Sequence, residues 1–151
     1  MAIQTGAEAP DFTLKNQNDE DWTLSAHRGS TIVLLWYPLD WSPTCEKEHC
    51  SLGQEIDLGD SDAVIVGISR DSVWSHKAWR ATKGIQHDLL ADPMLEVTRQ
   101  YDLVHPHAPF ISHRATVIVN KSGDIVFSEV QENTGAERDW GRIKAALASL
   151  E

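Results

Sequence analysis

The most informative part of the sequence reads TIVLLWYPLDWSPTC and occupies residues 31–45. Its first part, residues 31–37, is rich in β-branched and aromatic side chains and carries no charge, which is typical of a buried strand. Ser42 is a favourable helix N-cap and Pro43 suits the first helical position. Cys45 then falls in the first helical turn, where free backbone N–H groups and the helix dipole both favour a thiolate. The pattern therefore indicates a nucleophilic cysteine at a strand–helix junction.

Composition limits the class of protein. The 151 residues have the length of one domain with a substantial core, so we expect residues 1–151 to form a single domain. No apolar run approaches the roughly 20 residues that a membrane span needs. The N-terminal residues MAIQT lack the basic and apolar regions of a signal peptide, which predicts a cytoplasmic protein. Two cysteines in a reducing compartment suggest catalysis or redox cycling rather than a permanent cross-link.

The chain is strongly acidic. Its net charge of −10 comes from 13 basic and 23 acidic side chains. This balance disfavours nucleic acid or an anionic membrane as a main partner. A solvated acidic surface explains the charge, which carries no information about a substrate.

Strands and helices alternate along the sequence without linkers or repeats. We expect an N-terminal hairpin of Asp11–Leu14 and Trp22–Leu24, then the strand Thr31–Tyr37 and a helix over Pro43–Ile56. The next expected elements are the strand Ala63–Ile68 and a helix from Asp71 or Ser72 to about Lys83. Asp92-Pro93 should open another helix, with Met94, Val97, Thr98 and Tyr101 on one stripe. Then follow the strands Ala115–Val119 and Asp124–Phe127, joined by a turn at residues 120–123, and a last helix after Thr134-Gly135 with Trp140, Ile143, Leu147 and Leu150 on one face. Continuous apolar strands between helices predict an α/β fold whose sheet is covered on both faces, in a thioredoxin-like order.

The junction at Cys45 also resembles a known family. Peroxiredoxins carry Pro-x-x-x-Thr/Ser-x-x-Cys at such a junction, with Glu or Gln three residues after the cysteine. The matching residues here are Pro38, Ser42, Cys45 and Glu48. Further similar segments follow in the family's order: Gly6–Leu14, Gly67–Ser72, Leu89–Pro93 and Arg114–Val119. The resemblance implies a thioredoxin-like fold with an N-terminal β-hairpin extension and an inserted strand–helix unit at Leu89–Tyr101.

The same resemblance implies a thiol peroxidase that uses no cofactor. Cys45 would be the peroxidatic cysteine, which attacks a peroxide and becomes a sulfenic acid. Arg114 would hold the thiolate and the peroxide oxygens, since a guanidinium keeps its charge and presents a planar fork of donors. Glu48 would orient that arginine, Ser42 would donate its hydroxyl to the peroxide, and Pro38 would shield the thiolate from water. Purely structural roles stay open for all four residues. Arg114 could be an exposed strand-end residue and Glu48 a residue of the helix surface. Ser42 could be only a helix cap, and Pro38 only a turn residue.

Cys50 raises the question of how the oxidised cysteine is recycled. The Cys-x4-Cys spacing resembles Q-type peroxiredoxins, also called bacterioferritin comigratory proteins, which implies an intramolecular Cys45–Cys50 disulfide reduced by a thioredoxin-like protein. Residues five apart on a regular helix have Cα atoms about 8.6 Å apart, whereas a disulfide requires roughly 4.4–6.8 Å. The helix must therefore unwind locally before the bond can close. A passive Cys50 in a one-cysteine enzyme that uses an external thiol stays open, and we expect a monomer or a weak homodimer.

Two rivals come from other classes. A disulfide oxidoreductase is disfavoured because the sequence has no Cys-x-x-Cys and no proline directly before Ala115. A metal-binding or chaperone-like module on the same fold would use His105, His107 and His113. No Cys-x2-Cys or His-Glu-x2-His pattern accompanies these histidines. We therefore interpret them as incidental loop histidines and expect no metal.

Overall fold

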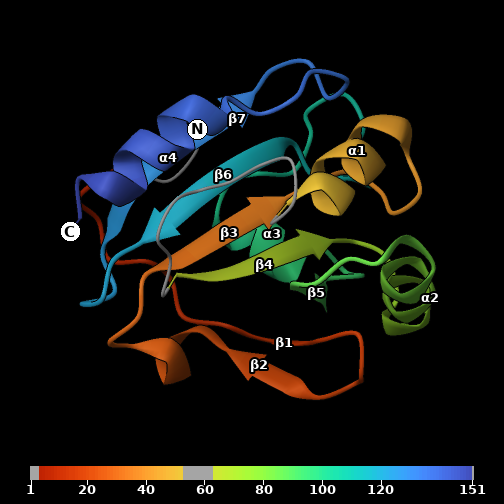
Figure 1. The fold of residues 1–151 in the computed structure, drawn as a ribbon, viewed down its shortest axis with the longest axis horizontal. Helices are drawn as coiled ribbons and strands as arrows, with labels where there is room; N and C mark the ends of the chain where they lie inside the picture. Colours follow the sequence, from red (N-terminus) through yellow and green to blue (C-terminus); the bar gives the residue numbers. More distant parts are fainter. Residues whose placement is uncertain (1–3, 53–62, 151) are drawn as a thin grey trace.

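The computed structural model describes residues 4–52 and 63–150. Its elements are β1 (Thr13–Lys15), β2 (Asp21–Thr23), the 3-10 helix η1 (Leu24–His27), β3 (Ile32–Trp36), α1 (Pro43–Ser51), β4 (Val64–Ser69), α2 (Val73–Lys83), β5 (Asp88–Ala91), α3 (Glu96–Gln100), β6 (Arg114–Val119), β7 (Ile125–Gln131) and α4 (Trp140–Ala148) (Figure 1). They form one seven-stranded sheet in the order β2-β1-β5-β4-β3-β6-β7. The central strands β3, β4 and β5 are parallel, and their other neighbours are antiparallel. The predicted α/β class is confirmed.

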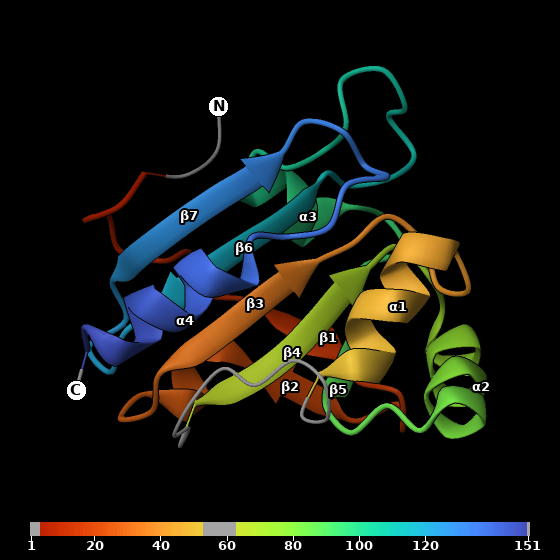
Figure 2. The same ribbon diagram turned by 45° about the horizontal axis from the view of Figure 1, so that its top comes forward.

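The alternation of side chains along β3 supplies the cores on both faces of the sheet. Val33 and Leu35 pack in one apolar cluster with Ile143 of α4. Leu34 and Trp36 point the other way and pack in a second cluster that includes residues of α3. Figure 2 shows α1 and α4 on the near side of the sheet and α3 behind it. Because both faces are covered, every residue of β3 is buried, as its uninterrupted apolar run predicts.

A glycine lets the first helix approach the sheet closely. A Cβ atom on Gly67 of β4 would lie 2.9 Å from Leu89 Cδ2, 3.0 Å from Tyr37 Cε1 and 3.1 Å from His49 Cε1. These distances leave no room for a larger side chain without movement of the neighbours. The absence of a side chain at this position thus allows His49 of α1 and Tyr37 to sit directly on β4.

The predicted C-terminal end of the cysteine helix is wrong. Helix α1 ends at Ser51 rather than at Ile56, because Leu52 leaves the helix with φ −62° and ψ 130°. The Leu52 side chain is buried in the cluster that contains Val33, so packing against the sheet ends the helix here. Residues 53–56 of the predicted range lie outside the described residues.

The predicted start of the following short helix is also wrong. Helix α3 begins at Glu96, its N-cap residue is Leu95, and Asp92 lies before it. The Asp92 carboxylate accepts hydrogen bonds from the Thr98 backbone N–H at 2.8 Å and from the Thr98 hydroxyl at 2.7 Å. Leu95 adopts a left-handed conformation with φ 56°. Met94 therefore lies outside the helix and is 71% exposed, not part of a buried stripe.

The remaining elements are confirmed with shifted ends. The N-terminal hairpin pairs Thr13–Lys15 with Asp21–Thr23. Strand β6 begins one residue before the predicted start, at Arg114, and β7 continues to Gln131. Helix α4 ends at Ala148, so the expected Leu150 lies beyond it and is partly exposed.

Candidate active site

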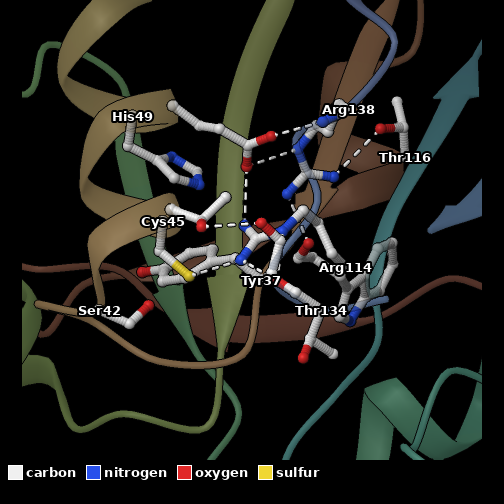
Figure 3. A network of polar contacts seen from close by, with 12 residues as sticks. Tyr37, Ser42, Cys45, His49, Arg114, Thr116, Thr134 and Arg138 are labelled. Atoms are coloured by element: carbon white, nitrogen blue, oxygen red, sulfur yellow. Dashed lines mark hydrogen bonds and ion pairs between the residues drawn. The ribbon is translucent and has the colours of Figure 1, made fainter. Parts of the chain in front are cut away.

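The pairing of two central strands brings an arginine to the cysteine. Strands β3 and β6 are antiparallel with Trp36 opposite Ala115, so Arg114 reaches the end of β3 where the chain turns toward α1. Arg114 and Cys45 are both buried. The Arg114 Nη2 group donates to Cys45 Sγ at 3.2 Å (Figure 3). The structure thus brings together the two residues at the centre of the sequence prediction.

Glu48 lies next to this contact, because residues three apart share one face of a helix. Its carboxylate is buried and accepts a hydrogen bond from Arg114 Nη1 at 2.7 Å. Its second oxygen accepts from the backbone N–H of Arg138 at 2.7 Å, and Arg138 Nε lies 3.3 Å from Oε1. One carboxylate is therefore held between two guanidinium groups.

Arg138 is a site residue that the sequence analysis missed. It lies just before α4, and its buried guanidinium donates to the backbone oxygens of Trp36 and Ala115 and to Thr116 Oγ1 at 3.1 Å (Figure 3). Burial lowers the pKa of Arg138 to about 10, which still leaves a cation at neutral pH. In the sequence it stands in a run of polar and charged residues, so no local pattern distinguishes it from a surface arginine.

The charges of the site favour an anion at the sulfur. Arg114 and Arg138 contribute two positive charges and Glu48 contributes one negative charge, which leaves one positive charge beside Cys45. A Cys45 thiolate would neutralise it. The backbone oxygen of Thr134 accepts from Arg114 Nε at 3.1 Å and from Nη2 at 2.8 Å, which fixes the plane of the guanidinium. The arrangement suits a nucleophilic thiolate with a fixed cation at the point of attack.

Ser42 and Pro38 lie in the turn between β3 and α1. Ser42 precedes α1 as its N-cap residue, but its hydroxyl makes no capping hydrogen bond and donates instead to the Leu39 backbone oxygen at 3.0 Å. The predicted N-cap position is therefore confirmed, without a hydrogen bond from the helix to the Ser42 side chain. Pro38 is buried at the end of β3.

Cys50 occupies the last turn of α1. It is partly buried against a cluster that contains Cys45, and both cysteines are free thiols. Burial raises the pKa of the Cys50 thiol, and the neighbouring charge of Glu46 raises it further. Glu48 and His49 lie between the two cysteines and are both buried. Any unwinding that joins the cysteines must therefore withdraw these two side chains from their contacts.

His49 and His87 form a hydrogen-bonded pair beneath α1. His49 Nδ1 lies 2.7 Å from His87 Nε2, and the His49 ring lies 4.4 Å from the ring of Tyr37. Burial lowers the pKa of His49 well below its ordinary value, with a further contribution from His87. Burial also lowers the pKa of His87 to about 3. Both rings are thus neutral at pH 7, with one donating to the other.

The loop histidines His105, His107 and His113 contact one another. His105 Nδ1 accepts hydrogen bonds from the backbone N–H groups of His107 and Ala108 at 3.1 Å each, so it shapes its own loop. The ring of His113 lies 5.0 Å from that of His105. Within residues 4–52 and 63–150, no cluster of three or more His, Cys, Asp or Glu side chains is arranged to hold a metal ion. In the same residues, no helix has the length and apolar character that crossing a membrane requires.

Comparisons with known proteins agree on one family. The AhpC/TSA family matches residues 5–128. Alkyl hydroperoxide reductase E of Mycobacterium tuberculosis is 33% identical over 152 residues, which cover 98% of each chain. Peroxiredoxin Bcp of Bacillus subtilis is 28% identical and covers 95% of this chain and 88% of its own.

Solved structures show the same fold. The crystal structure of peroxidoxin BcpB from Mycobacterium tuberculosis has a TM-score of 0.83 over 99% of both chains, at 24% identity. That of PrxQ from Xylella fastidiosa has a TM-score of 0.85 over 99% of this chain and 98% of its own, at 20% identity. The predicted thioredoxin-like fold is confirmed.

Replacing Arg138 by methionine should destabilise the fold strongly. Removing one partner of a buried charge cluster typically costs about 3–5 kcal/mol, here because Glu48 loses part of its compensation. Urea unfolding followed by circular dichroism measures the loss. Arg142→Met is the matched control, since Arg142 is 63% exposed in its ion pair with Glu129 and such pairs contribute about 0–1 kcal/mol. Equal losses in the two variants would contradict a structural role for Arg138.

Acid should destabilise the protein through His87. The pKa of His87 is about 3 in the folded protein, below the ordinary value of 6.5. As the pH falls below 6.5, His87 is therefore protonated in the unfolded chain but stays neutral in the folded one, which favours unfolding. This contribution to stability is complete above pH 6.5 and is lost down to about pH 3, at no more than about 1.4 kcal/mol per pH unit. Urea unfolding at a series of pH values measures the slope. His87→Gln should reduce the slope by the share of His87, while His49, whose pKa is also lowered by burial, keeps its own share. An unchanged slope would refute the assignment.

Proposed function

Because this chain belongs to the AhpC/TSA family and is a peroxiredoxin, a thiol-dependent peroxidase, we propose that it reduces hydrogen peroxide or organic hydroperoxides through Cys45. The observation that carries the proposal is the contact of 3.2 Å between Arg114 Nη2 and Cys45 Sγ. Both residues are buried, and Glu48 holds the guanidinium from its other side. A cation fixed in this way is suited to a thiolate nucleophile.

The proposed reaction begins at the sulfur. The Cys45 thiolate attacks the terminal peroxide oxygen, so that an S–O bond forms while the O–O bond breaks. The other oxygen leaves with the electron pair and is protonated to water or an alcohol, while the sulfur becomes a sulfenic acid. Arg114 stabilises the charge that spreads onto the leaving oxygen. Ser42 turns its hydroxyl from the Leu39 backbone oxygen to the peroxide and donates a hydrogen bond to it. Pro38 keeps water from the thiolate.

We assign the resolving step to Cys50. Its sulfur attacks the Cys45 sulfenic acid, the S–S bond forms, and water leaves. A thioredoxin-like dithiol protein then reduces the disulfide. This step requires α1 to unwind between the cysteines, which takes Glu48 away from Arg114 and Arg138. The disulfide form therefore lacks the assembled site and must be reduced before the next peroxide reacts.

A one-cysteine enzyme is the second candidate. Glu48 and His49, which lie between the cysteines, are both buried and hydrogen-bonded, and these contacts oppose the unwinding. An external thiol would then reduce the Cys45 sulfenic acid directly, and Cys50 would be a packing residue. The cytoplasmic location, the absence of nucleic-acid or membrane partners, and a monomeric or weakly dimeric state stay predictions from the sequence.

Replacing Cys45 by serine should abolish peroxide consumption while the fold persists. The substitution exchanges one small side chain for another and removes the nucleophile. Hydrogen peroxide consumption in the presence of a dithiol measures the effect, and the circular dichroism spectrum checks the fold. A Cys45→Ser protein that turns over at the wild-type rate would refute the proposed function.

Replacing Cys50 by serine separates the two candidates. After one equivalent of hydrogen peroxide, mass spectrometry of the wild type should show a Cys45–Cys50 disulfide, two hydrogen atoms lighter than the reduced protein. The Cys50→Ser variant should instead gain one oxygen at Cys45 and accumulate further oxygen at high peroxide. If the wild type also gains one oxygen, and both proteins turn over equally with thioredoxin, then the one-cysteine candidate is correct.

A further inference from the structure

A second buried polar cluster lies beside the site and is joined to it through Tyr37, which packs with Cys45. Asp40, in the turn before α1, and His76 of α2 both have fully buried side chains. His76 Nδ1 lies 2.8 Å from Asp40 Oδ2, and its Nε2 lies 3.1 Å from the backbone oxygen of Leu90. Because a carbonyl oxygen only accepts, Nε2 donates to Leu90, and Nδ1 faces the Asp40 carboxylate.

Besides the contact with His76, each carboxylate oxygen of Asp40 accepts a hydrogen bond from a hydroxyl group. The Tyr37 hydroxyl donates to Oδ1 at 2.6 Å, and the Ser75 hydroxyl donates to Oδ2 at 2.8 Å. A buried pair of this kind is seldom more stabilising than apolar side chains of the same volume. Its physical value is the single geometry that a fully satisfied network enforces.

That geometry is imposed on the turn that leads to Cys45. The Asp40 backbone N–H donates to Asp71 Oδ2 at 2.8 Å, so both the side chain and the backbone of Asp40 are held by α2 and the segment before it. The next residue, Trp41, has φ 70° and is 46% exposed. This left-handed conformation costs roughly 1–2 kcal/mol for a residue other than glycine. With so much of its side chain in solvent, Trp41 contributes little packing to offset that cost, and the anchored Asp40 supplies the constraint.

We propose that Asp40 and His76 are positioning residues for peroxide reduction, which hold the strained turn so that Pro38, Ser42 and Cys45 keep their places around the peroxide. Neither residue touches a reacting atom, and both act through the backbone of the turn. Helix α2 lies beside α1 at the same end of the sheet, which lets it brace the turn (Figures 1 and 2). The inference rests on the proposed function, which supplies the peroxide substrate and the roles of Pro38, Ser42 and Cys45.

Asp40→Ala removes the anchor and tests the proposal. Its second-order rate constant with hydrogen peroxide should fall by about 10- to 100-fold, because a misplacement of reacting groups by about 1 Å can lower a reaction rate about 100-fold. Alkylation of Cys45 by iodoacetamide should change far less, because that reagent needs the thiolate but not the turn. Both rates are measured on the reduced protein in single-turnover experiments.

Two further variants separate positioning from general destabilisation. Asp40→Asn can still accept from Tyr37 and can donate to His76 Nδ1 and Ser75, so it should retain a peroxide rate within a few-fold of wild type. Thr98→Val removes buried side-chain hydrogen bonds with Asp92 and Trp36, which involve neither Asp40 nor His76, and should leave the peroxide rate unchanged. If Asp40→Ala does not fold, His76→Gln replaces it, with the same expected loss of peroxide rate relative to alkylation.

Each alternative result has one meaning. A wild-type peroxide rate in Asp40→Ala overturns the proposal. So does an equal loss of the peroxide and alkylation rates in Asp40→Ala, if Thr98→Val shows the same loss. An Asp40→Asn protein that is as slow as Asp40→Ala also overturns it, because the hydrogen bonds would then not be what matters. If wild-type Cys45 itself fails to react with hydrogen peroxide but is alkylated, the proposed function fails rather than the role of Asp40.

Discussion

The site depends on one carboxylate held between two buried arginines. Desolvating Arg114 and Arg138 opposes folding, and their mutual repulsion adds to the cost. Glu48 offsets both, because it contacts each arginine from a single position on α1. The same contacts join α1 to β6 and to the segment before α4. The cluster of Glu48, Arg114 and Arg138 therefore both holds these elements together and places one uncompensated positive charge beside Cys45.

This centre also sets a conflict within α1. Glu48 must stay in place for Arg114 to be oriented toward the sulfur, yet it lies between the two cysteines that the proposed disulfide would join. The helix is short and ends at Ser51, so few hydrogen bonds resist its unwinding. The resistance comes instead from Glu48 and from the buried His49. Peroxide reactivity and disulfide formation thus demand opposite states of the same helical turn.

Local pattern predicted most of this arrangement, and contacts distant in sequence account for what it missed. The uncharged strand before the turn, the helix that begins at Pro43 and the meeting of Cys45 with Arg114 follow from periodicity and from the family motif. Arg138 could not be found in this way, because its burial depends on Glu48, which is 90 residues away. The end of α1 was missed for the same reason, since it is set by the packing of Leu52 against the sheet.

Trp41 is the point at which local preference and the fold disagree most clearly. An aromatic residue in the left-handed region opposes its own conformational preference, and such violations concentrate at functional positions. A glycine would adopt this φ without strain, but it would also let the turn adopt many other conformations. A bulky residue between an anchored Asp40 and the start of α1 leaves fewer alternatives. The left-handed conformation of Trp41 therefore destabilises the turn locally. The hydrogen bonds of Asp40 hold the turn in this conformation, which fixes the positions of the residues around the thiol.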